Sequence, residues 1–325
     1  MGRPIVIRTV ESLLSACRGM EVEILVCGEI PDPSVHGKIS SLAATNSHVR
    51  HFPVRWETGD SSRKKNHGAA QARAEIVAFL DDDVVVAPDW PKQILAAFED
   101  PAVGLVSGPS LIPEDITLSC RLVGLALTSR AAGYVADRYR GGASAREVNW
   151  SRIIGCNAAY RKSVFKAMGE FPPEFYPGEE MIAAWRTQQL GHKMVFIPQA
   201  WVHHYPRQSV KRFWRQVWGY GATRIRLIRA GTQFEWTTLV PAAWVLSLVV
   251  LIPAALMLPV ASLLLNISLM LYLLMALLVT AETIIHTRRP ADALVFFMIP
   301  VMHLSYGLSE WFEFFRPDRD YGDHD

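Results

Sequence analysis

The chain has 325 residues, 50% of them hydrophobic, and its mean hydropathy of +0.15 is high for a soluble protein. The formal net charge of only +2 excludes the general basic character that attracts nucleic acids. The four cysteines stand far apart with no Cys-x-x-Cys spacing, which argues against zinc and against a disulfide framework. A reducing environment fits this cysteine usage best.

The first two hundred residues alternate between strand-like and helix-like patterns. Residues 4–8 read either as a short strand or as the start of a helical apolar stripe that continues to Cys17. Residues 57–67 are polar and basic and predict a loop, which a short helix ending at Arg73 follows. Further strands are expected at 22–27, 49–54, 76–80, 103–107, 155–160 and 194–197, and helices at 34–46, 90–98, 116–135, 161–168 and 178–190. This alternation predicts an α/β fold with a mostly parallel sheet and helices on both faces.

Three carboxylates, Asp81, Asp82 and Asp83, follow the apolar strand expected at 76–80. Open α/β sheets bind ligands outside the carboxyl ends of their strands, so a site is expected here. Adjacent carboxylates repel one another and resist full ionisation unless a cation lies among them. Mg²⁺ or Mn²⁺ bound to a substrate phosphate would supply that charge. The alternative, a solvated acidic turn or helix cap, would be preferred for an isolated triplet.

A basic, aromatic segment follows the α/β region. Seven basic residues and no acidic one lie between His203 and Gly231, interleaved with tryptophan, phenylalanine and tyrosine. The pattern is typical of a helix at a membrane interface, with its aromatic side chains inward and its cations toward anionic head groups. A nucleic-acid patch is the alternative, which the apolar sequence that follows disfavours.

No charged residue occurs between Glu235 and Glu282, which leaves room for two membrane spans at about 239–258 and 260–281. Residues 293–309 form a third span or a re-entrant segment. Basic residues before the first span and at 286–290 predict that both lie on the cytoplasmic side. The expected domains are a cytosolic α/β domain at 1–200, interfacial helices at 201–236, a membrane domain at 237–316 and an acidic tail at 317–325.

Four motifs in this order resemble the inverting family 2 glycosyltransferases of the GT-A fold, in their membrane-anchored branch. They are KKNHG at 64–68 with the acidic strand, GCNAAYR at 155–161, GEEM at 178–181 with Trp185 and Arg186, and the segment from His203 to Gly221. The resemblance covers residues 3–230 and implies transfer of a sugar from a UDP-, GDP- or dTDP-sugar to a lipid-linked or polysaccharide acceptor. It implies no nucleic-acid partner.

The resemblance also implies roles for individual residues. Glu180 is the expected general base, and Asp83 and His203 are the expected metal ligands. His203 and His204 could each bind metal or phosphate, although a histidine among aromatic residues is as often structural. The residues expected to contact the nucleotide sugar, its ribose or its pyrophosphate are Glu29, Lys65, Asn66, Asp81, Asp82, Arg207, Arg215 and Gln216. Glu179 and Glu180 alone would merely favour a helix N-terminus.

The chain departs from the family pattern at several positions. Glu180 stands where the family usually has Asp, Ile182 replaces an acid, and Glu29 or Asp32 must serve for the nucleotide-contacting Asp. Residues 8–14 match the family's first helix, so the first strand is either replaced by residues 4–8 or encoded upstream of Met1. These departures keep open the alternative of a non-catalytic membrane subunit. A nucleotidyltransferase is a further alternative, because a similar sheet and similar carboxylates handle nucleoside triphosphates.

Overall fold

The computed structural model describes residues 5–142, 144–233 and 235–316. The chain forms two compact units, each built from two stretches of sequence. The first comprises Met1–Pro113 and Asp137–Tyr205, and the second comprises Glu114–Ala136 and Pro206–Asp325. The second unit thus includes residues 114–136, which the expected division at residue 200 assigns to the α/β domain.

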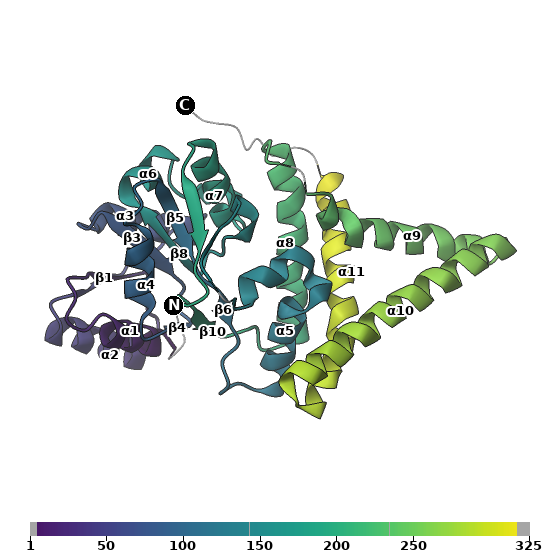
Figure 1. The fold of residues 1–325 in the computed structure, drawn as a ribbon, viewed down its shortest axis with the longest axis horizontal. Helices are drawn as coiled ribbons and strands as arrows, with labels where there is room; N and C mark the ends of the chain where they lie inside the picture. The colour runs from purple at the N-terminus through teal and green to yellow at the C-terminus, as the bar shows by residue number, and fades with distance from the viewer. Residues whose placement is uncertain (1–4, 143, 234, 317–325) are drawn as a thin grey trace. The chain divides into compact units, whose positions relative to one another are not determined.

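A five-stranded sheet forms the centre of the first unit (Figure 1). Strand β8 is antiparallel to both β3 and β5, whereas β9 is parallel to β5 and β7 is antiparallel to β9. The strands are β3 Ile76–Leu80, β8 Asn157–Arg161, β5 Val103–Ser107, β9 Lys193–Phe196 and β7 Arg146–Glu147. The predicted α/β class is confirmed, but the sheet is mixed rather than mostly parallel because β8 runs against both of its neighbours.

Two smaller sheets complete the strands of the first unit. Strands β1 (Ile24–Cys27) and β2 (Val49–Phe52) pair in parallel. Strand β10 (Val202–His204) lies between β4 (Val84–Val86), to which it is antiparallel, and β6 (Ser110–Leu111), to which it is parallel. Strand β10 therefore returns the chain to the strand that directly follows the three aspartates.

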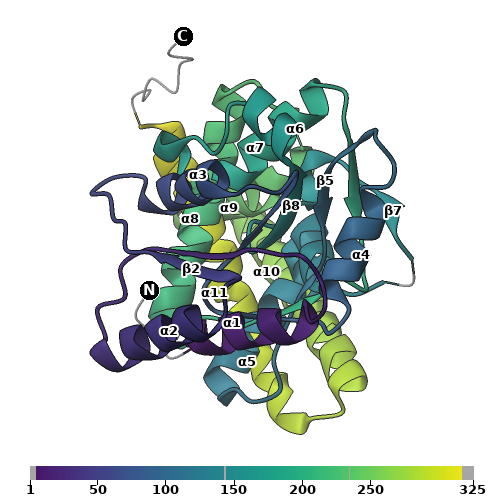
Figure 2. The same cartoon turned by 90° about the vertical axis from the view of Figure 1, so that its left-hand side faces the viewer.

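Helix α1 (Ile5–Ala16) settles the two interpretations of the N-terminal segment in favour of a helix. Its buried Val6 and Val10 pack with β1, β2 and α2 (Pro33–Thr45) in a small apolar core. Figures 1 and 2 show α1 and α2 side by side. The expectation that residues 4–8 replace the family's first strand is therefore wrong for residues 5–8, and residue 4 lies outside the described residues. Within the described chain β3 is an edge strand.

The segment expected to be a loop is mostly helical, because α3 runs over Asp60–Gln71 and the short helix expected before Arg73 begins earlier than predicted. The segment lacks apolar periodicity, which explains the wrong prediction. Local polar contacts stabilise its first turn instead. The Asp60 carboxylate accepts a hydrogen bond from the Trp56 amide at 2.9 Å and pairs with Lys64 one turn later.

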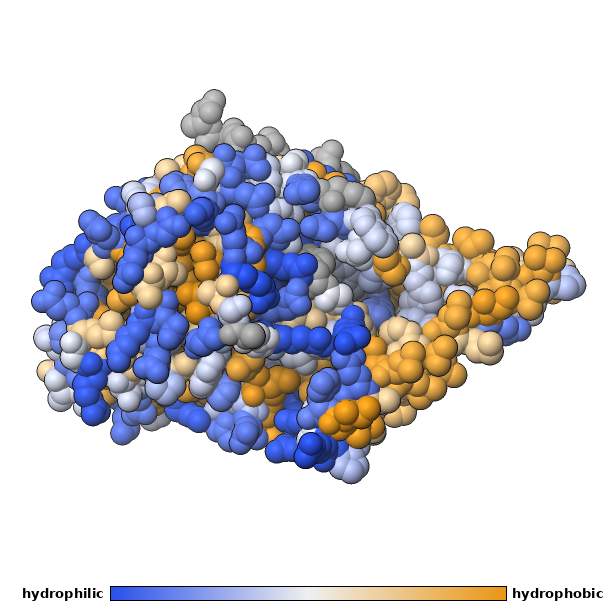
Figure 3. Space-filling view, in the orientation of Figure 1, coloured by the Kyte–Doolittle hydropathy of each residue, from blue (hydrophilic) through white to orange (hydrophobic). Residues whose placement is uncertain are grey.

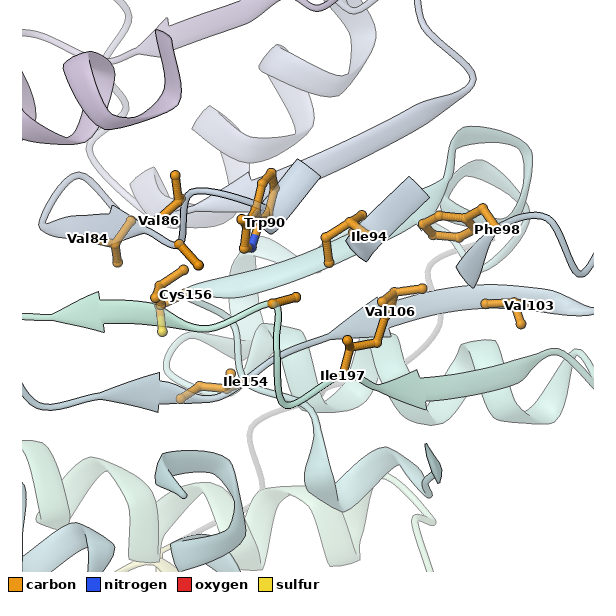
Figure 4. Close-up of a cluster of buried hydrophobic side chains, with 14 residues drawn as sticks. Val84, Val86, Trp90, Ile94, Phe98, Val103, Val106, Ile154, Cys156 and Ile197 are labelled. Carbon is orange, nitrogen blue, oxygen red and sulfur yellow. The ribbon is translucent and has the colours of Figure 1, made fainter. Parts of the chain in front are cut away.

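Helix α4 (Trp90–Ala97) packs on the sheet through a cluster of buried apolar side chains (Figure 4). Trp90 and Ile94 of α4 meet Val106 of β5, together with Val84 and Val86 of β4. The remaining described helices of this unit are α6 Lys162–Ala167, α7 Glu179–Gln189 and the single 3₁₀ turns Trp150–Arg152 and Pro173–Phe175. This packing fixes the strand ends that carry the acidic residues.

The second unit is helical. Helix α8 packs along α11, and α9 and α10 form a hairpin (Figure 1). The α-helices are α5 Leu118–Thr128, α8 Val210–Arg229, α9 Val240–Ala255, α10 Pro259–Thr287 and α11 Val295–Phe314. Two 3₁₀ turns lie at Trp236–Leu239 and Pro290–Leu294. A further 3₁₀ segment, Arg130–Tyr139, begins in this unit and continues along the chain into the first unit. A Cβ atom on Gly221 of α8 would lie 2.4 Å from the Tyr306 carbonyl oxygen, so glycine permits the close approach of α11.

Among the described residues of this unit, three helical segments are long and apolar enough to cross a membrane: Trp236–Ala255, Pro259–Thr287 and Pro290–Phe314. The open choice for residues 293–309 is thereby resolved toward a helix of spanning length. Apolar residues cover α9 and α10 in Figure 3. The acidic tail from residue 317 lies outside the described residues.

A buried ion pair inside the second unit leads to a prediction about stability. Arg121 donates three hydrogen bonds of 2.8–3.1 Å to Asp292, whose side chain is only 1% exposed. Without Arg121 the buried Asp292 carboxylate loses its main partner and, among the described residues, keeps only the Thr287 hydrogen bond and the attraction of Arg289. Arg121→Ala should therefore lower the free energy of unfolding by about 3 kcal/mol. Thermal unfolding of the full chain in detergent measures this change.

The matched control is Arg130→Ala. Arg130 pairs with Glu282 at 2.9 Å, but the arginine side chain is 74% exposed. An exposed pair contributes about 0–1 kcal/mol. Equal losses in the two variants would contradict the structural role given to Arg121.

Candidate active site

The three aspartates form the turn between β3 and β4, and α1 fixes the backbone of this turn. The buried Thr9 hydroxyl donates a hydrogen bond to the Asp82 carbonyl at 3.1 Å. The Val86 amide donates one to the Ser12 hydroxyl oxygen at 3.3 Å. Hydrogen bonds to α1 therefore fix the backbone of the turn, whereas the backbone of a free acidic surface loop has no such contacts.

Asp81, Asp83 and His204 form a group that can hold a metal ion, because their ligand atoms all lie within 4.8 Å of one another. The antiparallel pairing of β10 with β4 places His204 opposite Val84, next to Asp83. His204 Nε2 lies 3.0 Å from Asp83 Oδ1, and the Tyr205 amide donates to the Asp83 carbonyl at 3.2 Å. Two carboxylate oxygens and an imidazole nitrogen suit a divalent cation such as Mn²⁺.

The predicted metal ligand His203 is not in this group. Successive side chains of a strand point to opposite faces, so His203 and His204 diverge. The His203 ring packs on the Trp201 ring, with 4.6 Å between the ring centroids. Asp83 is therefore brought to a histidine, but to the neighbour of the one predicted.

The pKa shifts of Asp82 and His204 are those expected when neighbouring carboxylates repel one another. Burial raises the pKa of Asp82, and the Asp83 and Asp81 carboxylates raise it further. Burial by itself lowers the pKa of His204, but the nearby Cys156 sulfur and the Asp83 carboxylate outweigh it and hold that pKa well above its usual range. The cluster thus favours an added positive charge, which a bound cation would also supply.

Lys65 lies between the group of Asp81, Asp83 and His204, called the metal-compatible group below, and the N-terminus of α7. Its ammonium lies 3.3 Å from Glu179 Oε1 and 4.0 Å from Asp81 Oδ1. Burial by itself lowers the pKa of Lys65, but Glu179, Asp81 and Glu180 outweigh it and raise that pKa. Lys65 is consequently a fixed cation between two sets of carboxylates.

Two other residues predicted to contact the nucleotide make contacts of a different kind. The Asn66 amide donates to the Phe171 carbonyl at 2.9 Å and accepts from the Phe171 amide at 3.1 Å, so both of its polar ends hold protein backbone. Glu29 follows β1 and forms an exposed ion pair with Arg55 at 3.4 Å. Their predicted roles at the nucleotide stay predictions.

Glu180 lies in the first turn of α7 with its carboxyl group in a protein environment that resists ionisation. Burial raises its pKa first, and the Glu179 carboxylate raises it further, against opposing effects of Lys65 and Arg138. The hydroxyl of the fully buried Tyr160 has no hydrogen-bond partner among the described residues, and its pKa is raised by burial and then by Glu180 and Glu179. A carboxyl group with a raised pKa is suited to general-base work near neutral pH.

Gly155 makes room for the Glu180 side chain. A Cβ atom built on Gly155 would lie 3.0–3.2 Å from Cβ, Cγ and Cδ of Glu180, closer than ordinary contact. Gly155→Ala should therefore push the carboxyl group by a few tenths of an ångström. Because displacements of about 1 Å cost about a hundredfold, we expect kcat to fall roughly threefold to tenfold with little change in the donor KM.

Steady-state kinetics measures this effect, and Gly141→Ala is its matched control. A Cβ atom on Gly141 would meet nothing within 4 Å. Normal kcat in the Gly155→Ala variant would remove this glycine from the positioning of Glu180.

The remaining predicted residues, Arg207, Arg215 and Gln216, belong to the second unit. Arg215 is exposed on α8, and the Gln216 amide donates to the Tyr220 hydroxyl at 2.8 Å. Their contacts with a pyrophosphate stay predictions.

The sequence analysis considered His204 beside His203 as a possible metal or phosphate ligand but assigned the metal to His203, and it gave Glu179 and Gly155 no role of their own. Strand alternation was the available signal for His204, because it shares a face with the buried Val202. The roles of Glu179 and Gly155 depend on contacts with Lys65 and Glu180, which a sequence pattern does not display.

Comparison with known proteins places these features in a family. The profile of "Glycosyl transferase family 2" matches residues 3–169, more than half of the chain. The chain is 26% identical over 201 residues to the O-antigen chain rhamnosyltransferase RfbN of Salmonella typhimurium, covering 53% of this chain and 62% of that protein. It is 27% identical over 197 residues to WbaN of Salmonella anatum, covering 52% and 61%. The matched region thus spans about three fifths of the length of these relatives.

A solved structure has the same fold. The mannosyltransferase PcManGT of Pyrobaculum calidifontis, in complex with GDP-Man and Mn²⁺, aligns with a TM-score of 0.60 at 16% identity, covering 95% of this chain and 84% of that one. This similarity confirms the predicted GT-A fold. The profile match over more than half of its length shows that the chain belongs to glycosyl transferase family 2.

Proposed function

We propose that this protein is an inverting, metal-dependent glycosyltransferase that moves a sugar from a nucleotide-sugar donor to a lipid-linked or polysaccharide acceptor at a membrane. The observation that carries the proposal is the link through Lys65. This side chain connects the group of Asp81, Asp83 and His204 to the N-terminus of α7, where Glu180 lies. One site thus contains both a place for a charged leaving group and a base.

Glu180 would act on the acceptor side of the sugar. Its carboxylate takes the proton from the attacking hydroxyl while the oxygen forms a bond to the anomeric carbon. The bond from that carbon to the nucleoside diphosphate breaks on the opposite face, so the configuration inverts. The raised pKa of Glu180 makes its carboxylate a stronger base than an exposed glutamate.

Asp81, Asp83 and His204 would act on the leaving-group side, where they hold Mg²⁺ or Mn²⁺. A bound divalent cation supplies counter-charge to the phosphates of the departing nucleotide. Lys65 adds a fixed positive charge 4.0 Å from Asp81. Arg207, Arg215 and Gln216 would donate further hydrogen bonds to the pyrophosphate.

The second unit would place the enzyme at the cytoplasmic face of the cell membrane. Three helices of spanning length support multi-pass insertion. The basic residues of α8 and the arginines Arg288 and Arg289 after α10 support a cytoplasmic position for both segments. The rhamnosyltransferase relatives that act on an O-antigen chain support a lipid-linked saccharide as the acceptor.

The test uses membranes that contain the full chain, a panel of labelled dTDP-, GDP- and UDP-sugars, and lipid-linked saccharide acceptors. We expect transfer from one donor in the presence of Mn²⁺ or Mg²⁺, release of nucleoside diphosphate, and an inverted anomeric configuration by NMR. Release of pyrophosphate would instead identify a nucleotidyltransferase. Absence of both metal-dependent donor binding and turnover would favour a non-catalytic subunit.

The proposal also predicts how activity depends on pH. Only ionised Glu180 can accept a proton, and its raised pKa means that protonation occurs at a higher pH than for an ordinary glutamate, whose pKa is 4.5. The acid limb of the kcat/KM profile should therefore lie above pH 4.5. The charged and titratable neighbours that set its position are Glu179, Lys65, Arg138 and Tyr160.

Glu179→Gln removes the carboxylate that raises the Glu180 pKa by repulsion, so it should move the acid limb to lower pH. The measurement is a pH–rate profile of both proteins. An acid limb at the same pH in both would show that Glu179 does not tune the base.

A further inference from the structure

The apolar helix α10 contains an exposed amide side chain that has no hydrogen-bond partner within the described part of the chain. Asn266 is exposed, and its amide makes no hydrogen bond within the described residues. Two other polar groups of α10 are bonded inside the chain: the Thr280 hydroxyl donates to the Ala276 carbonyl at 2.7 Å, and the Tyr272 hydroxyl lies 3.0 Å from His303 Nδ1. Asn266 is therefore an anomaly on a surface of leucine, isoleucine and methionine.

The position of Asn266 along the helix places it well inside the apolar segment. At 1.5 Å per residue it lies about 10 Å from Pro259 and about 24 Å from Glu282. A short asparagine side chain cannot reach a membrane interface from that depth, as a long lysine or arginine side chain can. An amide in hydrocarbon without a partner is costly, so a partner is expected.

The exposed residues around Asn266 form a stripe suited to helix pairing. Leu263, Met270, Leu273 and Leu277 are 47–68% exposed and follow with Asn266 a spacing of three, four, three and four residues. This heptad spacing keeps one seam of a helix against a partner helix in a left-handed pair. These five residues define the stripe. Its apolar side chains can pack against a partner helix, and Asn266 can fix the register of the two helices by a hydrogen bond.

A second copy of this chain provides the matching group. Copies inserted with the same topology and related by a two-fold axis along the membrane normal bring the same residue to the same depth. A primary amide both donates and accepts, so the partial charges of two facing Asn266 side chains are complementary. We propose that α10 is the interface of a parallel homodimer in the membrane, with the Asn266 side chains hydrogen-bonded across it.

The inference rests on the membrane position proposed above, so the first measurement tests that position separately. Resistance of the full chain to alkaline extraction reports integration, and glycosyl transfer is assayed in the same vesicles. If the chain is not integrated, both proposals about the membrane fail. If it is integrated and active but monomeric, only the dimer is overturned.

Association is measured by energy transfer between labelled full-length chains in phosphatidylcholine vesicles diluted with increasing lipid. Asn266→Leu should weaken dimerisation about threefold to twentyfold, the range expected for interhelical hydrogen bonds in membranes. The matched control is Leu271→Ala, since Leu271 is 60% exposed but lies outside the stripe. Unchanged association in Asn266→Leu would overturn the proposal.

Cross-linking identifies the occupant and the face. Under oxidation Met270→Cys should give a disulfide-linked species of twice the chain mass, absent from the parent chain with its native cysteines and from Leu271→Cys. Equal cross-linking at both positions would overturn the interface. A product with a different protein in native membranes would replace the second copy by a heterologous partner, which also contradicts the proposal.

Discussion

Glu180→Gln is expected to lower kcat about 10²–10⁴-fold while donor binding stays close to that of the wild type. The amide is nearly isosteric with the carboxyl group but cannot accept the proton of the acceptor hydroxyl, and general-base contributions have this size. Because Glu180 packs against Gly155 and lies near Lys65, the substitution keeps the volume that those contacts require. Transfer in membranes and calorimetric donor binding with Mn²⁺ measure the two quantities.

Two further variants sharpen this test. Glu174→Gln is the matched control, since Glu174 is an exposed glutamate just before α7 and should retain full activity. Glu180→Asp restores the residue usual in the family and should keep more activity than the amide, reduced by the shorter reach of its carboxylate. Wild-type turnover of Glu180→Gln would remove this residue from the mechanism.

The extent to which sequence predicts this fold depends on the range of the interactions involved. The acidic strand and the apolar spans were predictable, because a continuous run of apolar residues marks each of them in the sequence. The direction of β8 was not, because an apolar strand reads the same whichever way it enters a sheet. The polar helix α3 lacked any periodic signal and is stabilised by Asp60 and by its contacts with Phe171.

The assignment of sequence segments to the second unit also depends on long-range contacts that the local sequence does not show. Residues 114–136 are apolar and helical, which predicts a helix but not the unit to which it belongs. Their place is set by distant residues, such as Asp292, which binds Arg121, and His303, whose Nε2 lies 2.7 Å from the Ala131 carbonyl oxygen. No local pattern encodes such a partner.

The candidate site was predictable in kind and less so in detail. Asp83 and Glu180 stand in motifs, so their types and order pointed to the chemistry. The sequence could not decide which of His203 and His204 lies beside Asp83, because only the pairing of β10 with β4 brings His204 to that carboxylate.

Asp83→Asn should abolish metal-dependent activity, with a loss in kcat/KM of at least about a thousandfold. The substitution replaces a charged oxygen ligand by a neutral amide and leaves His204 without the carboxylate that lies 3.0 Å from its Nε2. Metal ions contribute several kcal/mol of charge stabilisation to reactions with anionic leaving groups, which corresponds to this loss. Transfer assays over a Mn²⁺ titration measure it, and removal of metal with EDTA should inactivate the wild type to a similar level.

Metal binding can be separated from catalysis by a readout that needs no turnover. A cation that binds only the folded protein raises the unfolding temperature, so Mn²⁺ alone should stabilise the wild type and leave the Asp83→Asn variant unchanged. Asp89→Asn is the matched control, because that carboxylate is 71% exposed and outside the metal-compatible group. A normal Mn²⁺ shift in Asp83→Asn would place the metal elsewhere, whereas loss of both the shift and the activity would tie the cation to the turn between β3 and β4.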